Sequence, residues 1–278
     1  MSVDNSGLPD GWSQRPAVAR IDDCLTGGFN NFPADRQLAS RLVQEAPWFP
    51  DMVRDNRRYR NRVVTVLARE FGIRQYLDLG CGLPSLWSKK LQRHDPPLTY
   101  ESAASVHADA RVVYVDNDPV VYAHARTTLD VNSSTAAVFA DIRQIGELLD
   151  DPAVRALDIR QPTGVLLNGV LHWASDESAH IVTAELREWL ADGSAISVTH
   201  ATTDMAPETM RALVGHYAEA GIDYRPRTLE QISELLAPWE ILAPGIVPTA
   251  QWRPEDGTTP GENPGAYAAL ATPTRSGP

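Results

Sequence analysis

The chain has 278 residues, enough for one large α/β domain or for one domain with an N-terminal extension, and its content of 43% hydrophobic and 22% charged residues is ordinary for a globular protein. Its formal net charge of −11 argues against nucleic acid as a partner, because binding to phosphates needs a basic surface. The sequence predicts no membrane span, no signal peptide and no disulfide or zinc pattern, since Cys24 and Cys81 are its two cysteines. We expect a cytoplasmic protein that binds no metal.

The first part of the chain, residues 1–72, is predicted to form an arm followed by a helical cap. Residues 1–16 are polar and rich in turn-forming residues. Leucine, valine and phenylalanine then recur at helical spacing in 34–46 and 51–71, and Gly72 stands where the C-terminal cap of a helix belongs. The sequence leaves open whether this part closes over a binding site or only packs against the rest.

Strand and helix signals alternate in residues 73–278, which indicates a mostly parallel sheet with helices on both faces. The interval 83–110 is longer than one crossover helix needs, so we expect a helix and a mobile insertion there, either a solvated loop or a lid. The sequence predicts an α/β fold with seven strands, at 75–79, 111–116, 136–140, 164–171, 195–199, 240–246 and 266–271.

A glycine turn follows the first predicted strand. Gly80 and Gly82 leave the backbone open to a ligand, and Asp116 at the end of the second strand could bind both hydroxyls of a ribose. A nicotinamide dinucleotide is disfavoured, because its fingerprint has a third glycine where Ser85 stands. Its acidic residue also lies about 20 residues after the turn, whereas Asp116 lies 36 residues after Gly80.

The run Asp78-Leu79-Gly80-Cys81-Gly82 resembles the first motif of class I S-adenosylmethionine-dependent methyltransferases. A wider set of blocks is similar to an actinobacterial family of such enzymes long catalogued as a domain of unknown function. The chain departs from that family's usual residues at Asp22, at Cys81 and after Pro84. The similar blocks are residues 19–32, 35–36, 56–57, 80–84, 111–119 and 171–172, with His200.

The resemblance implies a Rossmann-like sheet that binds S-adenosylmethionine. It places the ribose at Asp116, the adenine at Asp141 and Ile142, and the methionine amino group near Asn168. Asp141 could instead be a plain helix N-cap, and Arg57 could bind the methionine carboxylate or form a surface salt bridge. The predicted cofactor-binding set is completed by Asp78, Gly80, Cys81, Gly82, Asn117 and Asp118.

The methyl acceptor is the weakest part of the sequence prediction. His172 and His200 follow predicted strands and are candidates for a general base, although a histidine with apolar neighbours is often structural. Trp12, Asn31 and Trp173 could line an acceptor pocket. We expect a methyltransferase for a small molecule, such as an aromatic or indole-like specialised metabolite. The alternative is a sensor that binds S-adenosylmethionine without catalysis.

Overall fold

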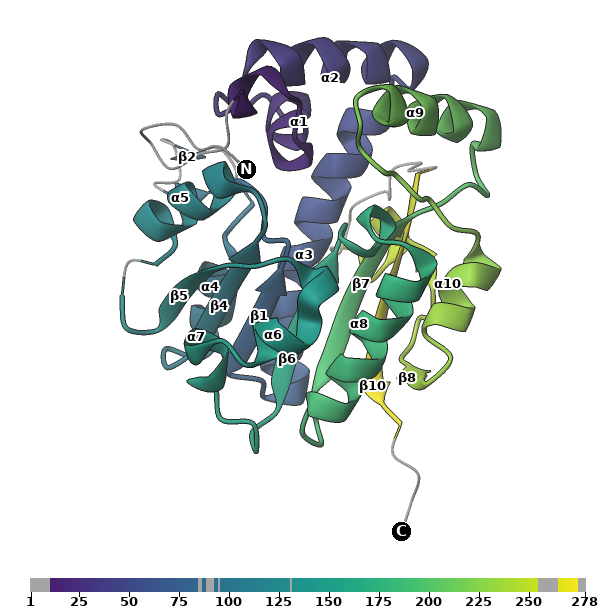
Figure 1. Ribbon diagram of the computed structural model, residues 1–278. Coiled ribbons are helices and arrows are strands. Elements are labelled where there is room, and N and C mark those ends of the chain that lie inside the picture. Colours follow the sequence, from purple (N-terminus) through teal and green to yellow (C-terminus); the bar gives the residue numbers. More distant parts are fainter. Residues whose placement is uncertain are drawn as a thin grey trace.

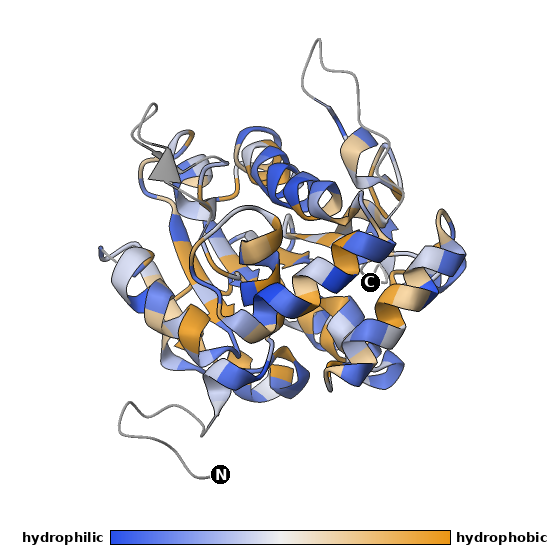
Figure 2. Cartoon of the chain, turned by 90° about the horizontal axis from the view of Figure 1, so that it is seen from above, coloured by the Kyte–Doolittle hydropathy of each residue, from blue (hydrophilic) through white to orange (hydrophobic). Residues whose placement is uncertain are grey.

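The computed structural model describes residues 11–84, 87–88, 93–94, 96–130, 132–254 and 265–274. It shows a central sheet with helices on both faces and a group of helices above one end of the strands (Figure 1). Seen from that end, hydrophobic residues gather on the strands and on the helix sides that face them (Figure 2). The molecule is therefore layered around the sheet, as the alternating sequence pattern predicts.

The sheet has eight strands and is mostly parallel. Its first five strands in spatial order are parallel neighbours, and the sixth, β10, runs antiparallel to the strands on both of its sides. The predicted fold is confirmed, with a two-residue strand, β9 (Val247–Pro248), added beside β10. The spatial order is β5 (Thr135–Phe139), β4 (Arg111–Asp116), β1 (Gln75–Leu79), β6 (Thr163–Asn168), β7 (Ala195–Ala201), β10 (Ala266–Pro273) and β8 (Trp239–Ile241).

Two predicted strands are shorter in the structure. The strand expected at 164–171 ends at Asn168, because Gly169 adopts a positive φ of 76° and turns the chain into the 3₁₀ helix η3 (Leu171–Trp173). The strand expected at 240–246 ends at Ile241. In the interval after the glycine turn, the described residues form a small hairpin and a short helix, and the expected mobile insertion lies partly outside them. These elements are β2 (Trp87–Ser88), β3 (Arg93–His94) and α4 (Thr99–Ala104).

Helices cover both faces of the sheet because successive strand side chains point to opposite faces. Along β1, Leu77 and Leu79 belong to one buried cluster and Tyr76 to the other. The first cluster is completed by α6 (Ile145–Leu149), α7 (Pro152–Arg155), α8 (Asp176–Trp189) and α10 (Leu229–Leu235). The second is completed by α3 (Phe49–Phe71), α4 and α5 (Pro119–Thr128).

The predicted helical cap is present, and it has a hydrophobic core of its own. It contains α1 (Val18–Leu25), α2 (Pro33–Glu45) and α9 (Pro207–Glu219), which lie above the sheet in Figure 1. The first turns of α3 belong to the same cluster through Phe49 and Met52. The cap is thus assembled from two distant parts of the chain, of which the sequence pattern indicated only the first.

A buried ion pair holds the start of the cap together. The Asp35 carboxylate accepts a hydrogen bond from Arg20 Nε at 3.0 Å, and both side chains are almost fully buried. The same carboxylate accepts from the backbone N–H of Ala17, just before α1, and of Phe32, just before α2. Asp35 therefore fixes the beginnings of both helices relative to each other.

Removing this carboxylate should destabilise the fold strongly. We expect Asp35→Ala to lower the free energy of unfolding by about 3–5 kcal/mol, because the buried Arg20 guanidinium loses the carboxylate to which it is hydrogen-bonded and keeps only Asp118, 3.9 Å away, as a counter-charge. Urea unfolding followed by circular dichroism measures the loss. The control is Asp109→Ala, which breaks the exposed pair with Arg74 and should cost about 1 kcal/mol or less. Equal losses in the two variants would contradict the assigned role.

Candidate functional site

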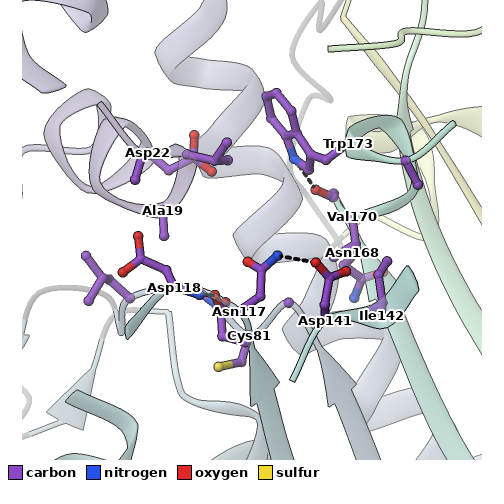
Figure 3. Close-up of a pocket in the computed structure, with 18 of the residues that line it drawn as sticks. Ala19, Asp22, Cys81, Asn117, Asp118, Asp141, Ile142, Asn168, Val170 and Trp173 are labelled. Carbon is purple, nitrogen blue, oxygen red and sulfur yellow. Dashed lines mark hydrogen bonds between the residues drawn. The ribbon is translucent and has the colours of Figure 1, made fainter. Parts of the chain in front are cut away.

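A pocket of about 560 Å³ lies between the carboxyl ends of the parallel strands and the cap. This edge of a doubly wound sheet is where such folds bind their ligands. Figure 3 shows residues from the ends of β1, β4, β5 and β6 facing residues of α1 across the cavity. Every residue predicted to bind the cofactor lines this pocket: Arg57, Asp78, Gly80, Cys81, Gly82, Asp116, Asn117, Asp118, Asp141, Ile142 and Asn168.

At the glycine turn, backbone atoms without side chains line the pocket. The N–H groups of Gly80 and Cys81 both donate to the carbonyl of Val115, at 2.8 and 3.0 Å, which ties the turn to the end of β4. Gly80 and Gly82 have φ values of 66° and 65°. A Cβ at Gly80 would lie only 2.4 Å from Val170 Cγ2. Glycine is thus required there by both conformation and space.

Asp116 is the carboxylate at the end of β4. It accepts hydrogen bonds from the backbone N–H groups of Gly82 at 3.0 Å and Asp118 at 2.9 Å. Burial nevertheless raises the pKa of Asp116 to about 6. Asp118 caps α5 by accepting from Val120 N at 2.7 Å. Both carboxylates line the pocket at the end of β4.

Asp141 follows β5 and stands beside Ile142 on the pocket wall. Its carboxylate accepts from the backbone and the guanidinium of Arg143, and from the amide of Asn117 at 3.1 Å. The Arg143 guanidinium, through these hydrogen bonds, lowers the pKa of Asp141 to about 2. Asp141 is thus an N-cap, and the lowered pKa of its carboxyl favours the ionised form at neutral pH.

Polar atoms without partners line the region between the glycine turn and β6. Within the described part of the chain, Asn168 Nδ2 and Arg60 Nε are buried and have no hydrogen-bond partner. Asp78 is also buried, and burial raises its pKa although it accepts a 2.6 Å hydrogen bond from Thr99. Such unsatisfied groups indicate a polar ligand. Arg60, Asp78 and Asn168 thus give the pocket wall a cation, a carboxylate and an amide.

One face of α3 contributes four residues to the pocket, and the sequence analysis had named Arg57 among them as a cofactor residue. Val53, Asn56, Arg57 and Arg60 all line the pocket, and their spacing of three and four places them on the same side of the helix. Arg57 donates to the hydroxyl of Thr26 at 2.9 Å and forms no ion pair within the described residues, so it is not the surface salt bridge considered above. The sequence signal that could have identified this face is the helical spacing of the polar residues Asn56, Arg57 and Arg60.

The two histidines lie outside the pocket. His172 and His200 are buried, and neither is among the residues that line the cavity. His172 Nδ1 accepts from the backbone N–H of Ala201, while His200 is held between the carbonyl of Ala201 and the guanidinium of Arg227. Burial lowers the pKa of both, to about 3 for His200. Their contacts are those of neutral structural side chains.

The three residues predicted to bind the acceptor are not brought together. Trp173 lines the pocket, with its Nε1 donating to the carbonyl of Gly169 at 2.9 Å. Trp12 packs edge-on against Phe32, at a centroid distance of 4.9 Å, on the cap. Asn31 donates to Asp23 and to the carbonyl of Gly28, and so stabilises its own loop. Only Trp173 of the three is placed to touch a ligand.

Asp176 and Asp204 are engaged by other groups of the protein. Asp176 accepts two hydrogen bonds from the Arg227 guanidinium, and Asp204 accepts from the backbone N–H of Leu229 at 2.7 Å. Across the residues that the structure describes, no three His, Cys, Asp or Glu side chains form a group suited to a metal ion. No described helix has the length and apolar character needed to cross a bilayer.

The chain matches a family described as S-adenosyl methyltransferase over residues 11–275, and it belongs to that family. A candidate methyltransferase from Thermobifida fusca is 35% identical, with a TM-score of 0.86 over 96% of this chain and 98% of that one. A DUF574 family protein from Streptomyces avermitilis is 33% identical, with a TM-score of 0.85 over 94% and 99%. No curated protein matches the chain. The predicted family, the enzyme class and S-adenosylmethionine as cofactor are confirmed.

Cys81 should behave as a packing residue although it lies between the two pocket glycines. Burial and the neighbouring Asp116 and Asp78 raise the pKa of its thiol well above the usual value. We therefore expect Cys24→Ser, which leaves only Cys81, to react with Ellman's reagent roughly 50-fold more slowly than a free thiol at pH 8. Cys81→Ser is the control, because it keeps the less buried Cys24. Fast labelling of Cys24→Ser would contradict this.

Proposed function

We propose that this methyltransferase acts on a small molecule that binds under the cap. The observation that supports this is one pocket that is lined by the predicted cofactor residues and also by Asp22 and Trp173, which lie on its cap side (Figure 3). Its volume of about 560 Å³ is within the range of roughly 300–1,000 Å³ usual for small-molecule sites. Bound S-adenosylmethionine would supply an electrophilic methyl group on its sulfonium.

The residues around the lower part of the pocket suggest how the cofactor is held. Asp116 would accept from the ribose hydroxyls, and Asp141 from the adenine amino group while Ile142 covers the ring. Asn168 and Arg60, with their unpartnered buried nitrogens, face the remaining polar end. In this proposal Arg60 binds the methionine carboxylate. Its hydrogen bond to the carbonyl of Cys81, at 3.3 Å, places the guanidinium beside the glycine turn. Arg57 lies further toward the cap, beside Asp22.

The upper part of the pocket suggests a flat acceptor. Trp173 is stacked on Tyr224, with ring centroids 4.6 Å apart, and this contact fixes the indole beside the cavity. An aromatic ring can pack against such a surface with little loss of conformational entropy. The cap encloses this part of the pocket, which favours a small molecule over a polymer. We propose an aromatic specialised metabolite as the acceptor.

Loss of the Asp116 carboxylate should weaken binding of the cofactor and of its product. We expect Asp116→Ala to raise the dissociation constant of S-adenosylhomocysteine about 10- to 100-fold, because hydrogen bonds to a charged group contribute about 1.5–3 kcal/mol. Isothermal titration calorimetry measures the change. The control is Asp109→Ala, which removes the same charge at an exposed position far from the pocket. Unchanged affinity in Asp116→Ala would place the ribose elsewhere.

The same carboxylate should make binding depend on pH. Because the pKa of Asp116 is raised to about 6, the group is ionised at pH 8 and protonated at pH 5. Only the ionised form accepts from both ribose hydroxyls. We therefore expect affinity for S-adenosylhomocysteine to fall as the pH drops through 6, by up to about tenfold per unit. Asp116→Asn should flatten the profile, and an equally steep profile in that variant would assign the titration to another group.

A further inference from the structure

Asp22 lies on α1, at the cap end of the pocket. Its carboxylate lines the cavity together with Val18 and Ala19 from the same helix. In Figure 3, Asp22 and Trp173 occupy the cap side of the cavity, whereas Asn117 and Asp141 lie on the side of the strand ends. Asp22 is thus separated from the residues proposed to hold the nucleotide, and it faces the space left for the acceptor.

Asp22 differs from the other carboxylates of the pocket in having no hydrogen-bond donor. Among the described residues, none donates to its side chain. Each of the others accepts at least one hydrogen bond: Asp78 from Thr99, Asp116 from Gly82, Asp118 from Val120, Asp141 from Arg143 and Asp223 from Arg225. Asp22 is half-buried on the cavity wall, so a carboxylate that no protein group occupies there is open to a hydrogen-bond donor on a ligand.

The groups around Asp22 leave its carboxylate free to bind a ligand. Burial raises its pKa to about 6, opposed by the positive charge of Arg57 on α3 and reinforced by Asp23 on α1. Arg57 donates instead to the hydroxyl of Thr26 and forms no ion pair with Asp22 in the described structure. Tyr217 on α9 and Tyr224 in the segment after it lie near Asp22. Burial and the negative charge of Asp22 raise the pKa of both tyrosines, and their buried hydroxyls also lack a partner among the described residues.

We propose that Asp22 binds the proton-bearing nucleophile of the acceptor, an N–H or O–H group on a planar molecule, and accepts its proton during methyl transfer. This rests on the function proposed above. The lone pair of the nitrogen or oxygen forms the bond to the methyl carbon, and the carbon–sulfur bond breaks with its electron pair kept on sulfur. The proton passes from the acceptor to the Asp22 carboxylate and then to water. The products are the methylated acceptor and S-adenosylhomocysteine.

Two further features favour Asp22 for this role. No histidine, lysine or tyrosine is among the described residues that line the pocket, and the Cys81 thiol is held protonated by its surroundings. A carboxylate that titrates near pH 6 can be ionised before the reaction and still accept a proton near neutral pH. A fully methylated amine would present no proton, and a carbon nucleophile would present only a C–H group, so neither would give Asp22 an N–H or O–H donor.

The test uses radiolabelled S-adenosylmethionine and a defined panel of planar amines and phenols, each paired with its fully N- or O-methylated form. We expect the wild-type protein to label only the N–H and O–H compounds. Asp22→Asn should lower kcat by roughly 100-fold or more, as expected for loss of a general base, while leaving affinity for S-adenosylhomocysteine and the melting temperature unchanged. Wild-type kcat should rise with pH through about 6, and Asp22→Asn should lack this rise.

Controls separate this proposal from the function on which it rests. Asp22→Glu should recover part of the rate, and Asp109→Asn should match the wild type because it makes the same charge change at an exposed site. Equal rates in Asp22→Asn and wild type, or labelling of the methylated forms, would overturn the role of Asp22 and leave methyl transfer to small molecules intact. Labelling of no compound by a wild-type protein that binds S-adenosylmethionine would count against both.

Discussion

The buried ion pair between Arg20 and Asp35 is the interaction on which the pocket depends. It joins the starts of α1 and α2, and α1 is the helix that forms the cap side of the cavity. Arg20 also lies 3.9 Å from the Asp118 carboxylate, which caps α5 below. One guanidinium thus connects the cap with the strand ends. Because each charge is shielded from water by its partner, loss of either would leave the other unsatisfied.

The two ends of the pocket are built in different ways. The proposed cofactor end consists of turns that follow parallel strands, and the sheet hydrogen bonds fix where Gly80, Asp116 and Asn168 lie. The proposed acceptor end consists of side chains from helices and from the segment after β6, including Asp22 and Trp173. Cofactor binding, which the family shares, can therefore depend on the strand-end turns alone. Differences in acceptor can arise on the cap without disturbing the turns below it.

Local sequence was sufficient for the sheet and for the strand-end residues. Strands β1 and β4 match their predicted bounds, because buried apolar runs, the glycine turn and the terminal Asp116 are all local signals. The direction in which a side chain points after the end of a strand is not determined by the local sequence alone. Gly169 turns the chain after β6, and this leaves His172 buried against β7 while Trp173 reaches the pocket. Asp22 and Arg60 were not predicted to line the pocket, because tertiary packing decides which face of a helix lies against the cavity.

Helix α3 has a mechanical consequence for the position of the cap. It runs without a break through 23 residues, with Phe49, Met52 and Val53 in the cap cluster and Tyr59, Val63 and Leu67 in the cluster on one face of the sheet. A continuous helix does not act as a hinge. The cap cannot swing on α3 without breaking backbone hydrogen bonds or separating one of the two cores. Within the part of the chain that the structure describes, α3 therefore fixes the position of its side of the cap over the strand ends.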